Sequence, residues 1–143
     1  MNFTSIEFGT PEYDDTVALR TEVLRKPLNL EFFPEDLALE YDQFHFGLYD
    51  DHHNLLGCLI LKEAGAETIK MRQVAVSEKM QRKGIGKKMV QESEFWASQK
   101  GYKVIELSAR EGAVEFYKSM DYTVEGDRFV EVGIPHFHMK KII

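Results

Sequence analysis

Hydrophobic residues along this chain alternate with the two-residue period of strands in some segments and recur with helical spacing in others. The clearest strand pattern is a hairpin, in which residues 44–49 and 55–62 flank a polar turn. Further strands are predicted over residues 2–8, 67–76, 103–108, 122–130 and 136–141. Most of the predicted sheet is therefore antiparallel.

Helical spacing is clearest between residues 83 and 100, where Ile85, Met89 and Trp96 fall on one face and Gly101 provides a C-cap. An earlier helix should begin near Asp14 and end before Pro27, because proline does not continue a helix. Helices are predicted over residues 14–26, 35–41, 83–100 and 112–120.

The predicted element order is β-α-α-β-β-β-α-β-α-β-β. Its middle strand-helix-strand unit should form a right-handed parallel crossover inside an otherwise mostly antiparallel sheet. The chain contains no linker and no internal repeat. The sequence therefore predicts a mixed α/β fold, with residues 1–143 in a single domain.

Composition and net charge limit the classes of partner that the protein could bind and the compartment in which it is expected. The formal net charge is −6 and the pI about 5.4, which speaks against nucleic acid or an anionic membrane as partner. The longest apolar run, residues 55–61, is shorter than the roughly 20 residues that cross a bilayer. The N-terminus has no signal-peptide pattern, and Cys58 is the only cysteine. We therefore expect a cytoplasmic protein without an internal disulfide.

The candidate chemistry lies at residues 73–88, where a strand runs through a short loop into a helix. The first turn of a helix has unpaired N–H groups, and Gly84 and Gly86 allow a phosphate to approach them closely. The cations around this turn are Arg82, Lys83, Lys87 and Lys88. In an acidic protein, this combination predicts a diphosphate site.

Other phosphate-binding motifs fit this segment less well. A dinucleotide fingerprint would need a third glycine at the position of Met89. A Walker A loop would need glycine at Gln81 and serine or threonine at Lys88. A nucleotide-phosphate enzyme that binds ATP or NAD stays as a third functional alternative.

The hexapeptide Q-R-K-G-I-G at residues 81–86, which follows V-A-V at 74–76, resembles the pyrophosphate loop of the GNAT superfamily of acyl-CoA-dependent N-acetyltransferases, Q/R-x-x-G-x-G/A. Residues 109–122 resemble the family's A-x-x-F-Y-x-x-x-G-F/Y segment, and residues 19–25 its first helix. The C-terminal stretch 131–140 is similar to that of some small bacterial members. The resemblance spans nearly the whole chain.

The sequence departs from the family pattern at two positions. Asp121 stands where the family usually has glycine, and Arg110 stands where many members carry asparagine. Aspartate tolerates left-handed backbone better than most residues, so we expect the turn to form. The resemblance therefore implies no role for the Arg110 side chain.

The resemblance implies acetyl-CoA as the acyl donor. The pantetheine arm would pair with the backbone of 74–76, in a splay between this strand and the strand at 104–108. The implied donor-binding residues are Val74, Ala75, Val76, Gln81, Arg82, Lys83, Gly84, Ile85, Gly86 and Lys87. The N–H of Val76 would also stabilise the oxyanion that forms during acyl transfer.

Three residues are candidates for catalysis. Tyr117 would protonate the leaving thiolate or hydrogen-bond to it, although its place on an apolar helix stripe also fits core packing. Glu131 and His136 flank the predicted loop between the last two strands and are the candidate general bases. A water relay is an equal alternative to either base.

No metal site is predicted, because His136 and His138 on one strand face supply only two ligands. The apolar loop contains Leu28, Leu30, Phe32 and Phe33. It has three open interpretations: a wall of the acceptor pocket, a homodimer contact, or ordinary core.

The sequence thus predicts an N-acetyltransferase that transfers an acetyl or other acyl group to a primary amine. The amine belongs to a small molecule or to a protein, and the negative net charge favours a small cationic acceptor. The alternative is a catalytically inactive module that binds acyl-CoA as a sensor or interaction partner.

Overall fold

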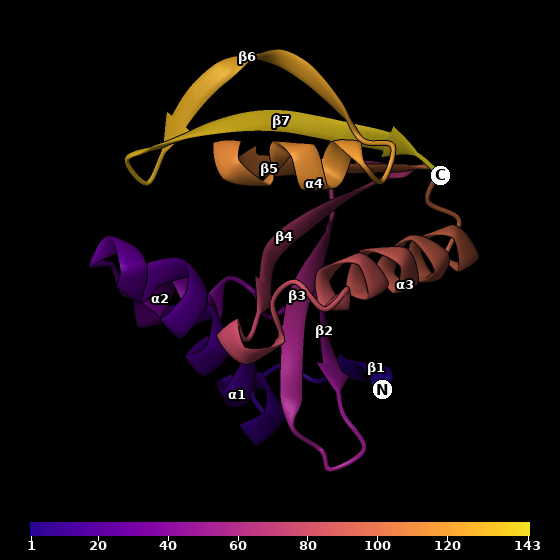
Figure 1. The fold of residues 1–143 in the computed structure, drawn as a ribbon. Helices are drawn as coiled ribbons and strands as arrows, with labels where there is room; N and C mark the ends of the chain where they lie inside the picture. The colour runs from indigo at the N-terminus through magenta and orange to yellow at the C-terminus, as the bar shows by residue number, and fades with distance from the viewer.

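Seven strands form one mixed sheet in the computed structural model, which describes residues 1–143 (Figure 1). The strands are β1 (Asn2–Ile6), β2 (Phe44–Tyr49), β3 (Leu55–Glu63), β4 (Thr68–Val76), β5 (Val104–Arg110), β6 (Thr123–Glu131) and β7 (Ile134–Ile142). Their spatial order is β1-β2-β3-β4-β5-β7-β6. Only the β4–β5 pair is parallel, which confirms the predicted crossover in a mostly antiparallel sheet.

Four α-helices connect or cover these strands, in the order that the sequence predicts. They are α1 (Pro11–Arg20), α2 (Pro34–Ala38), α3 (Ile85–Gln99) and α4 (Val114–Lys118). A π-helical turn, η1 (Thr21–Arg25), directly continues α1, and 3₁₀ turns occupy Lys26–Leu28, Glu78–Met80 and Glu111–Ala113. None of the helices combines the length and the apolar character needed to span a membrane.

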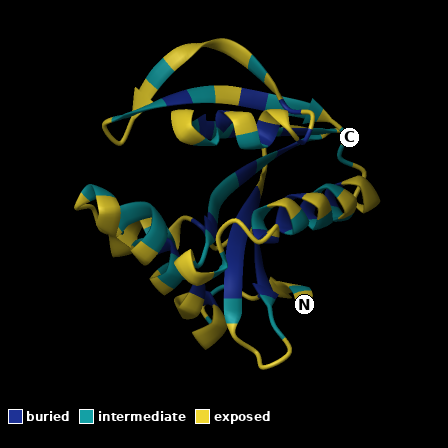
Figure 2. Cartoon of the chain, in the orientation of Figure 1, coloured by how far each residue is buried: buried dark blue, intermediate teal, exposed yellow.

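The helices cover the sheet in layers. Helices α1 and α3 both contact β3 and β4, and Figure 1 shows them on either side of these strands. Strand β3 is buried from Leu56 to Leu61, on both of its faces, as expected for a strand covered on both sides (Figure 2).

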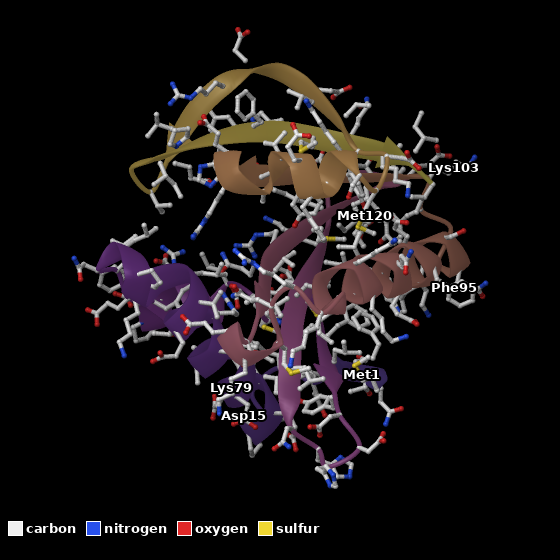
Figure 3. The ribbon with its side chains drawn as sticks, in the orientation of Figure 1. Met1, Asp15, Lys79, Phe95, Lys103 and Met120 are labelled. Carbon is white, nitrogen blue, oxygen red and sulfur yellow. The ribbon has the colours of Figure 1, made fainter.

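The main apolar core lies between the sheet and helices α3 and α4. It includes Met89 and Val90 of α3, both fully buried, and Met120 just after α4 (Figure 3). A Cβ at Gly57 of β3 would lie 2.7 Å from the sulfur of Met89. The missing side chain at Gly57 therefore lets α3 approach the sheet closely.

A buried polar network joins α1 to the turn before β2. The Arg20 guanidinium donates two hydrogen bonds of 2.8 Å to the Glu40 carboxylate, which also accepts one of 2.8 Å from the Tyr13 hydroxyl. Burial alone would raise the pKa of Glu40, but the hydrogen bonds and charge of Arg20 outweigh it and keep that pKa below its ordinary value. The network therefore holds a charged carboxylate in the interior.

The boundaries of the first helix differ from the prediction. Helix α1 begins at Pro11, because the Thr10 side chain caps it by accepting from the Tyr13 N–H at 3.3 Å and because proline fits the first helical turn. The α-helix ends at Arg20 and widens into η1. The predicted first strand ends earlier, at Ile6, and the predicted helix over residues 112–120 begins as a 3₁₀ turn.

The last hairpin was predicted with a loop between residues 130 and 136, and this is wrong. Strand β6 continues to Glu131, and β7 begins at Ile134. Val132 and Gly133 form a two-residue turn with φ of 47° and 77°. Such a turn normally carries Asn-Gly, so a β-branched residue in this conformation gives no recognisable signal in the sequence.

Candidate active site

The loop before α3 presents unpaired backbone donors. None of the backbone N–H groups from Arg82 to Lys87 donates a hydrogen bond within the chain. Gly84 caps the helix with φ of 80°, and a side chain there would point into open space. Lys79, labelled in Figure 3, marks the turn that leads into this loop. The arrangement leaves a row of N–H groups free for an anion.

The cations of this loop are mostly free as well. Arg82, Lys83 and Lys87 form no ion pair, and only Lys88 pairs, with Glu92 at 3.5 Å. The loop backbone and its side chains therefore act together as a positive surface, which fits a diphosphate.

Gly86 marks where this loop meets the rest of the site. A Cβ at Gly86 would lie 3.4 Å from the Phe116 ring of α4 and 3.7 Å from the Val76 side chain of β4. These are ordinary contact distances, so the first turn of α3 lies directly beside the end of β4 and helix α4.

Strands β4 and β5 separate halfway along their length. Their parallel pairing covers only Thr68 to Met71 of β4. Gln73 then has φ of 54°, and the β3–β4 register shifts at the same place, so β4 contains a bulge that bends it away from β5. The segment from Val74 to Val76 has no partner on its β5 side, and the predicted splay is confirmed.

The end of β4 has a backbone N–H group that points into the gap between β4 and β5. The N–H of Ser77 donates to the Leu56 carbonyl of β3 at 2.9 Å. Because successive N–H groups of a strand point to opposite sides, the N–H of Val76 points away from β3 and toward the gap. The GNAT resemblance implies that this N–H group stabilises the oxyanion.

The gap opens into a cavity of about 390 Å³, here called the central cavity. Its lining includes Val74, Ala109, Tyr117, Glu131 and His136, so all three predicted catalytic residues meet there. The predicted phosphate-loop residues lie outside this cavity, at the start of α3. The roles of these residues in binding and catalysis stay predictions.

Tyr117 is buried, at 7% exposure, yet its hydroxyl forms no hydrogen bond within the chain. Burial raises the pKa of Tyr117 to about 12. The side chain therefore stays protonated near neutral pH and presents a free O–H donor beside the gap.

His136 and Glu131 form a pair across the last hairpin. The Nδ1 atom of His136 lies 2.9 Å from the Ile134 carbonyl, and a carbonyl only accepts, so Nδ1 carries the proton. The Nε2 atom lies 3.6 Å from the Glu131 carboxylate. A neutral His136 therefore has its basic lone pair on Nε2, with a carboxylate close enough to stabilise the protonated ring.

The structure adds cationic residues that sequence reasoning missed. Arg25, Lys70, Arg72 and Arg110 also line the central cavity. The one available signal was Arg110, which stands where the GNAT resemblance favours asparagine. The others come from η1 and β4, and no motif connects them.

A second cavity of about 490 Å³, here called the outer cavity, adjoins the first. The two share Arg25, Arg72, Gln73 and Val132. Three members of the predicted apolar loop, Leu30, Phe32 and Phe33, line the outer cavity, whereas Leu28 does not. Their place agrees with the interpretation as a pocket wall, and the dimer contact stays a prediction.

The mixed sheet that opens beside a helix N-terminus with free amides agrees with the fold that the GNAT resemblance implies. The sequence matches the family model of the acetyltransferase (GNAT) domain over residues 13–143. The chain therefore belongs to the GNAT acetyltransferase family. The Bacillus subtilis (strain 168) protein YyaT is 30% identical over 76 residues, 53% of this chain and 51% of YyaT. The chain thus spans about half the length of that relative.

Solved structures share the fold over nearly the whole chain. An acyl-CoA N-acyltransferase from Pseudomonas aeruginosa superimposes with a TM-score of 0.80 at 20% identity, covering 99% of both chains. A GNAT family acetyltransferase from Elizabethkingia anophelis, with acetyl-CoA bound, gives 0.77 at 18% identity, covering 99% of this chain and 97% of the other. At these identities, the likeness establishes the fold.

Proposed function

We propose that this protein transfers an acyl group from acyl-CoA to an amine. The observation that carries the proposal is the continuity of three features. The free N–H groups at the start of α3 adjoin the unpaired edge of β4, and this edge leads into a cavity lined by Tyr117 and His136. Membership of the GNAT family supports acyl-CoA as the donor.

The chain's own groups fit each part of the donor. The N–H groups from Arg82 to Lys87, with the unpaired cations of the same loop, would hold the pyrophosphate. The backbone of Val74 to Val76 would pair with the amide groups of the pantetheine arm, like an added strand. This placement directs the acyl end toward the central cavity.

His136 is the base that the geometry favours, and Glu131 assists it. An alkylamine with a pKa near 10.4 is protonated at pH 7, and removing that proton costs about 4–5 kcal/mol. The Nε2 atom of His136 accepts it, and the Glu131 carboxylate 3.6 Å away stabilises the imidazolium. The neutral acceptor nitrogen then bonds to the carbonyl carbon, and the carbon–sulfur bond breaks. The second proton of that nitrogen passes to water, which leaves a neutral amide.

Val76 and Tyr117 act on the two atoms that gain negative charge. The Val76 N–H donates to the carbonyl oxygen, and the Tyr117 hydroxyl donates to the leaving sulfur. With the Tyr117 pKa near 12, full proton transfer to a thiolate whose conjugate pKa is near 8.5 is uphill by about 5 kcal/mol. Tyr117 therefore acts as a hydrogen-bond donor, and the thiolate takes its proton from solvent.

The donor site is tested by Gly84→Asp. The new carboxylate adds negative charge and a side chain at positive φ where the phosphates should bind, so CoA affinity should fall at least about tenfold. Gly101→Asp is the matched control. Gly101 also has a positive φ, of 92°, and a side chain there would also point into open space, but it lies at the other end of α3. Isothermal calorimetry with CoA measures both. Equal affinities in the two variants would reject this loop as the phosphate site.

Turnover separates the enzyme from the inactive module. Free thiol released from acetyl-CoA is measured with a panel of primary amines. Amine-dependent release supports the transferase, and its loss in His136→Asn would support the base. CoA binding without release for any amine favours the sensor or interaction module.

A further inference from the structure

The central cavity is strongly cationic within an acidic protein. Its charged lining comprises Arg25, Lys70, Arg72, Arg110 and Glu131, four positive groups and one negative group. The whole chain has a formal net charge of −6. The residues around the reacting centre therefore have the opposite charge balance from the molecule as a whole.

Arg72 has partners within the protein. Its Nη1 atom donates to the Gln43 side chain at 2.6 Å and lies 3.8 Å from the Glu40 carboxylate. Arg20 already binds both oxygens of Glu40, so one carboxylate serves two guanidinium groups. Arg72 is positioned by these contacts and only partly neutralised.

Arg25 and Arg110 have no carboxylate partner. Arg110 donates one hydrogen bond, of 2.9 Å, to the Leu24 carbonyl and forms no ion pair. Arg25 follows Leu24 in the chain, and its guanidinium packs on the Phe32 ring at 4.5 Å, with no side-chain hydrogen bond or ion pair. Two half-buried guanidinium groups are thus held next to each other with donors unused.

The electrostatic cost of this arrangement supports a ligand. Burial lowers the pKa of Arg110, the nearby charge of Arg25 lowers it further, and the charge of Glu131 offsets these effects only in part. Like charges in a partly desolvated cavity repel unless a counter-charge joins them. Arg110 also pairs with His136 in the β5–β7 register, so the two cations adjoin the proposed base.

We infer that Arg25 and Arg110 bind an anionic oxygen group, a carboxylate or phosphate, on the acceptor amine, an assignment that rests on the proposed acyl transfer. Guanidinium groups match both anions through paired N–H donors. The anion bound at Arg25 and Arg110 would leave the amine of the same molecule near His136. The acceptor class is therefore an amino acid or another amine with an acidic group.

The first experiment measures thiol release from acetyl-CoA with free L-amino acids, each compared with its own carboxamide, and with O-phosphoethanolamine compared with ethanolamine. For the acceptor used best, the member of the pair with the acidic group should have a kcat/KM at least about tenfold above the member without it. The amino-acid pairs test recognition of a carboxylate, and the O-phosphoethanolamine pair tests recognition of a phosphate. Amines without an acidic group used as well as, or better than, their partners with one would overturn the inference.

The second experiment assigns the effect to Arg25. Arg25→Gln should raise the KM of the anionic acceptor about tenfold, and Arg25→Lys should recover part of the loss by keeping the charge. Arg128→Gln is the matched control, because Arg128 lies outside both cavities in an exposed pair with Glu111. An Arg25→Gln enzyme with unchanged KM for the anionic acceptor would also overturn the inference.

A binding assay distinguishes this inference from the acyltransferase proposal. CoA affinity should be the same in wild type and Arg25→Gln, and a loss in the variant would assign the arginine to the donor. Calorimetry then titrates N-acetylated amino acids and their carboxamides into the CoA-saturated protein. Preferential binding of the acids supports the anion site even if no turnover is found. Equal binding of the acids and the carboxamides, or no binding of either, overturns the inference of an anion site. Failure of the wild-type protein to bind CoA instead rejects the acyltransferase proposal itself.

Discussion

At the scale of one residue, the ring and the hydroxyl of Tyr117 have different roles. Its ring belongs to the buried core and lies 5.6 Å from the ring of Tyr122. The Tyr122 hydroxyl donates to Glu94 at 2.9 Å, whereas the Tyr117 hydroxyl has no partner within the chain, and Tyr117 is among the residues that line the central cavity. Packing therefore accounts for the Tyr117 ring and leaves its hydroxyl free for the substrate.

Tyr117→Phe should leave stability within about 0.5 kcal/mol of wild type, because the lost hydroxyl has no partner. The kcat should fall about tenfold, the effect of losing a transition-state hydrogen bond of about 1.4 kcal/mol, with little change in CoA affinity. Tyr122→Phe is the control, with a stability loss of about 1 kcal/mol and unchanged kcat. Urea unfolding and thiol-release kinetics measure these effects. A fully active Tyr117→Phe enzyme would assign the residue to packing alone.

At the scale of elements, the acceptor side depends on the polar network beneath α1. Glu40 binds Arg20 and Tyr13 and lies near Arg72 of β4, so it links three segments that are distant in sequence. The π turn η1, which carries Arg25, directly follows Arg20. The position of the arginine cluster is therefore coupled to this buried carboxylate.

Glu40→Gln should lower the free energy of unfolding by about 3 kcal/mol, because it leaves a buried guanidinium without its counter-charge. Glu125→Gln is the control, since Glu125 pairs with Lys140 at 2.9 Å on the surface and its loss should cost less than about 1 kcal/mol. Urea denaturation compares the two variants. If they lose equal stability, the network does not anchor α1.

At the scale of the whole molecule, several tyrosines make stability depend on alkaline pH. Burial raises the pKa of Tyr117 to about 12, and burial together with a hydrogen bond to Glu40 raises that of Tyr13 to about 12. Below pH 10 both residues are protonated in the folded and the unfolded chain. Between pH 10 and 12 only the unfolded chain releases these protons, so the folded state loses relative stability.

The free energy of unfolding should fall by about 2–3 kcal/mol for each of these tyrosines as the pH rises from 10 to 12. Tyr117→Phe should remove its share of this slope, whereas Tyr41→Phe, at a residue that is 68% exposed, should leave the slope unchanged. Urea unfolding at a series of pH values gives the slopes. Identical slopes in wild type and Tyr117→Phe would contradict burial as the source of the dependence.

Net charge and the lining of the central cavity favour different acceptors at this same scale. The acidic sequence favoured a cationic acceptor, whereas the central cavity collects four cationic residues against Glu131. Net charge sums over the whole surface, but a ligand senses the charges within roughly a Debye length of it. The charges that line the cavity therefore bear more directly on the acceptor than the net charge of the chain does.

The sequence alone determined the features that depend on neighbouring residues. Strand and helix periods predicted the element order, and the spacing of Gln81, Gly84 and Gly86 predicted the phosphate loop, because the unpaired amides of a helix start are a local property. Asp121 adopts φ of 71°, as expected for an aspartate in place of glycine at this turn.

Only the tertiary structure decided what depends on contacts between distant segments. The β4 bulge opens the gap in the sheet, and the strained turn at Val132 extends β6 and β7 so that Glu131 and His136 meet. Arg25 and Arg110 come together because η1 packs against the end of β5 through the Leu24 carbonyl. Register and packing create these contacts, and no local pattern of residue types encodes them.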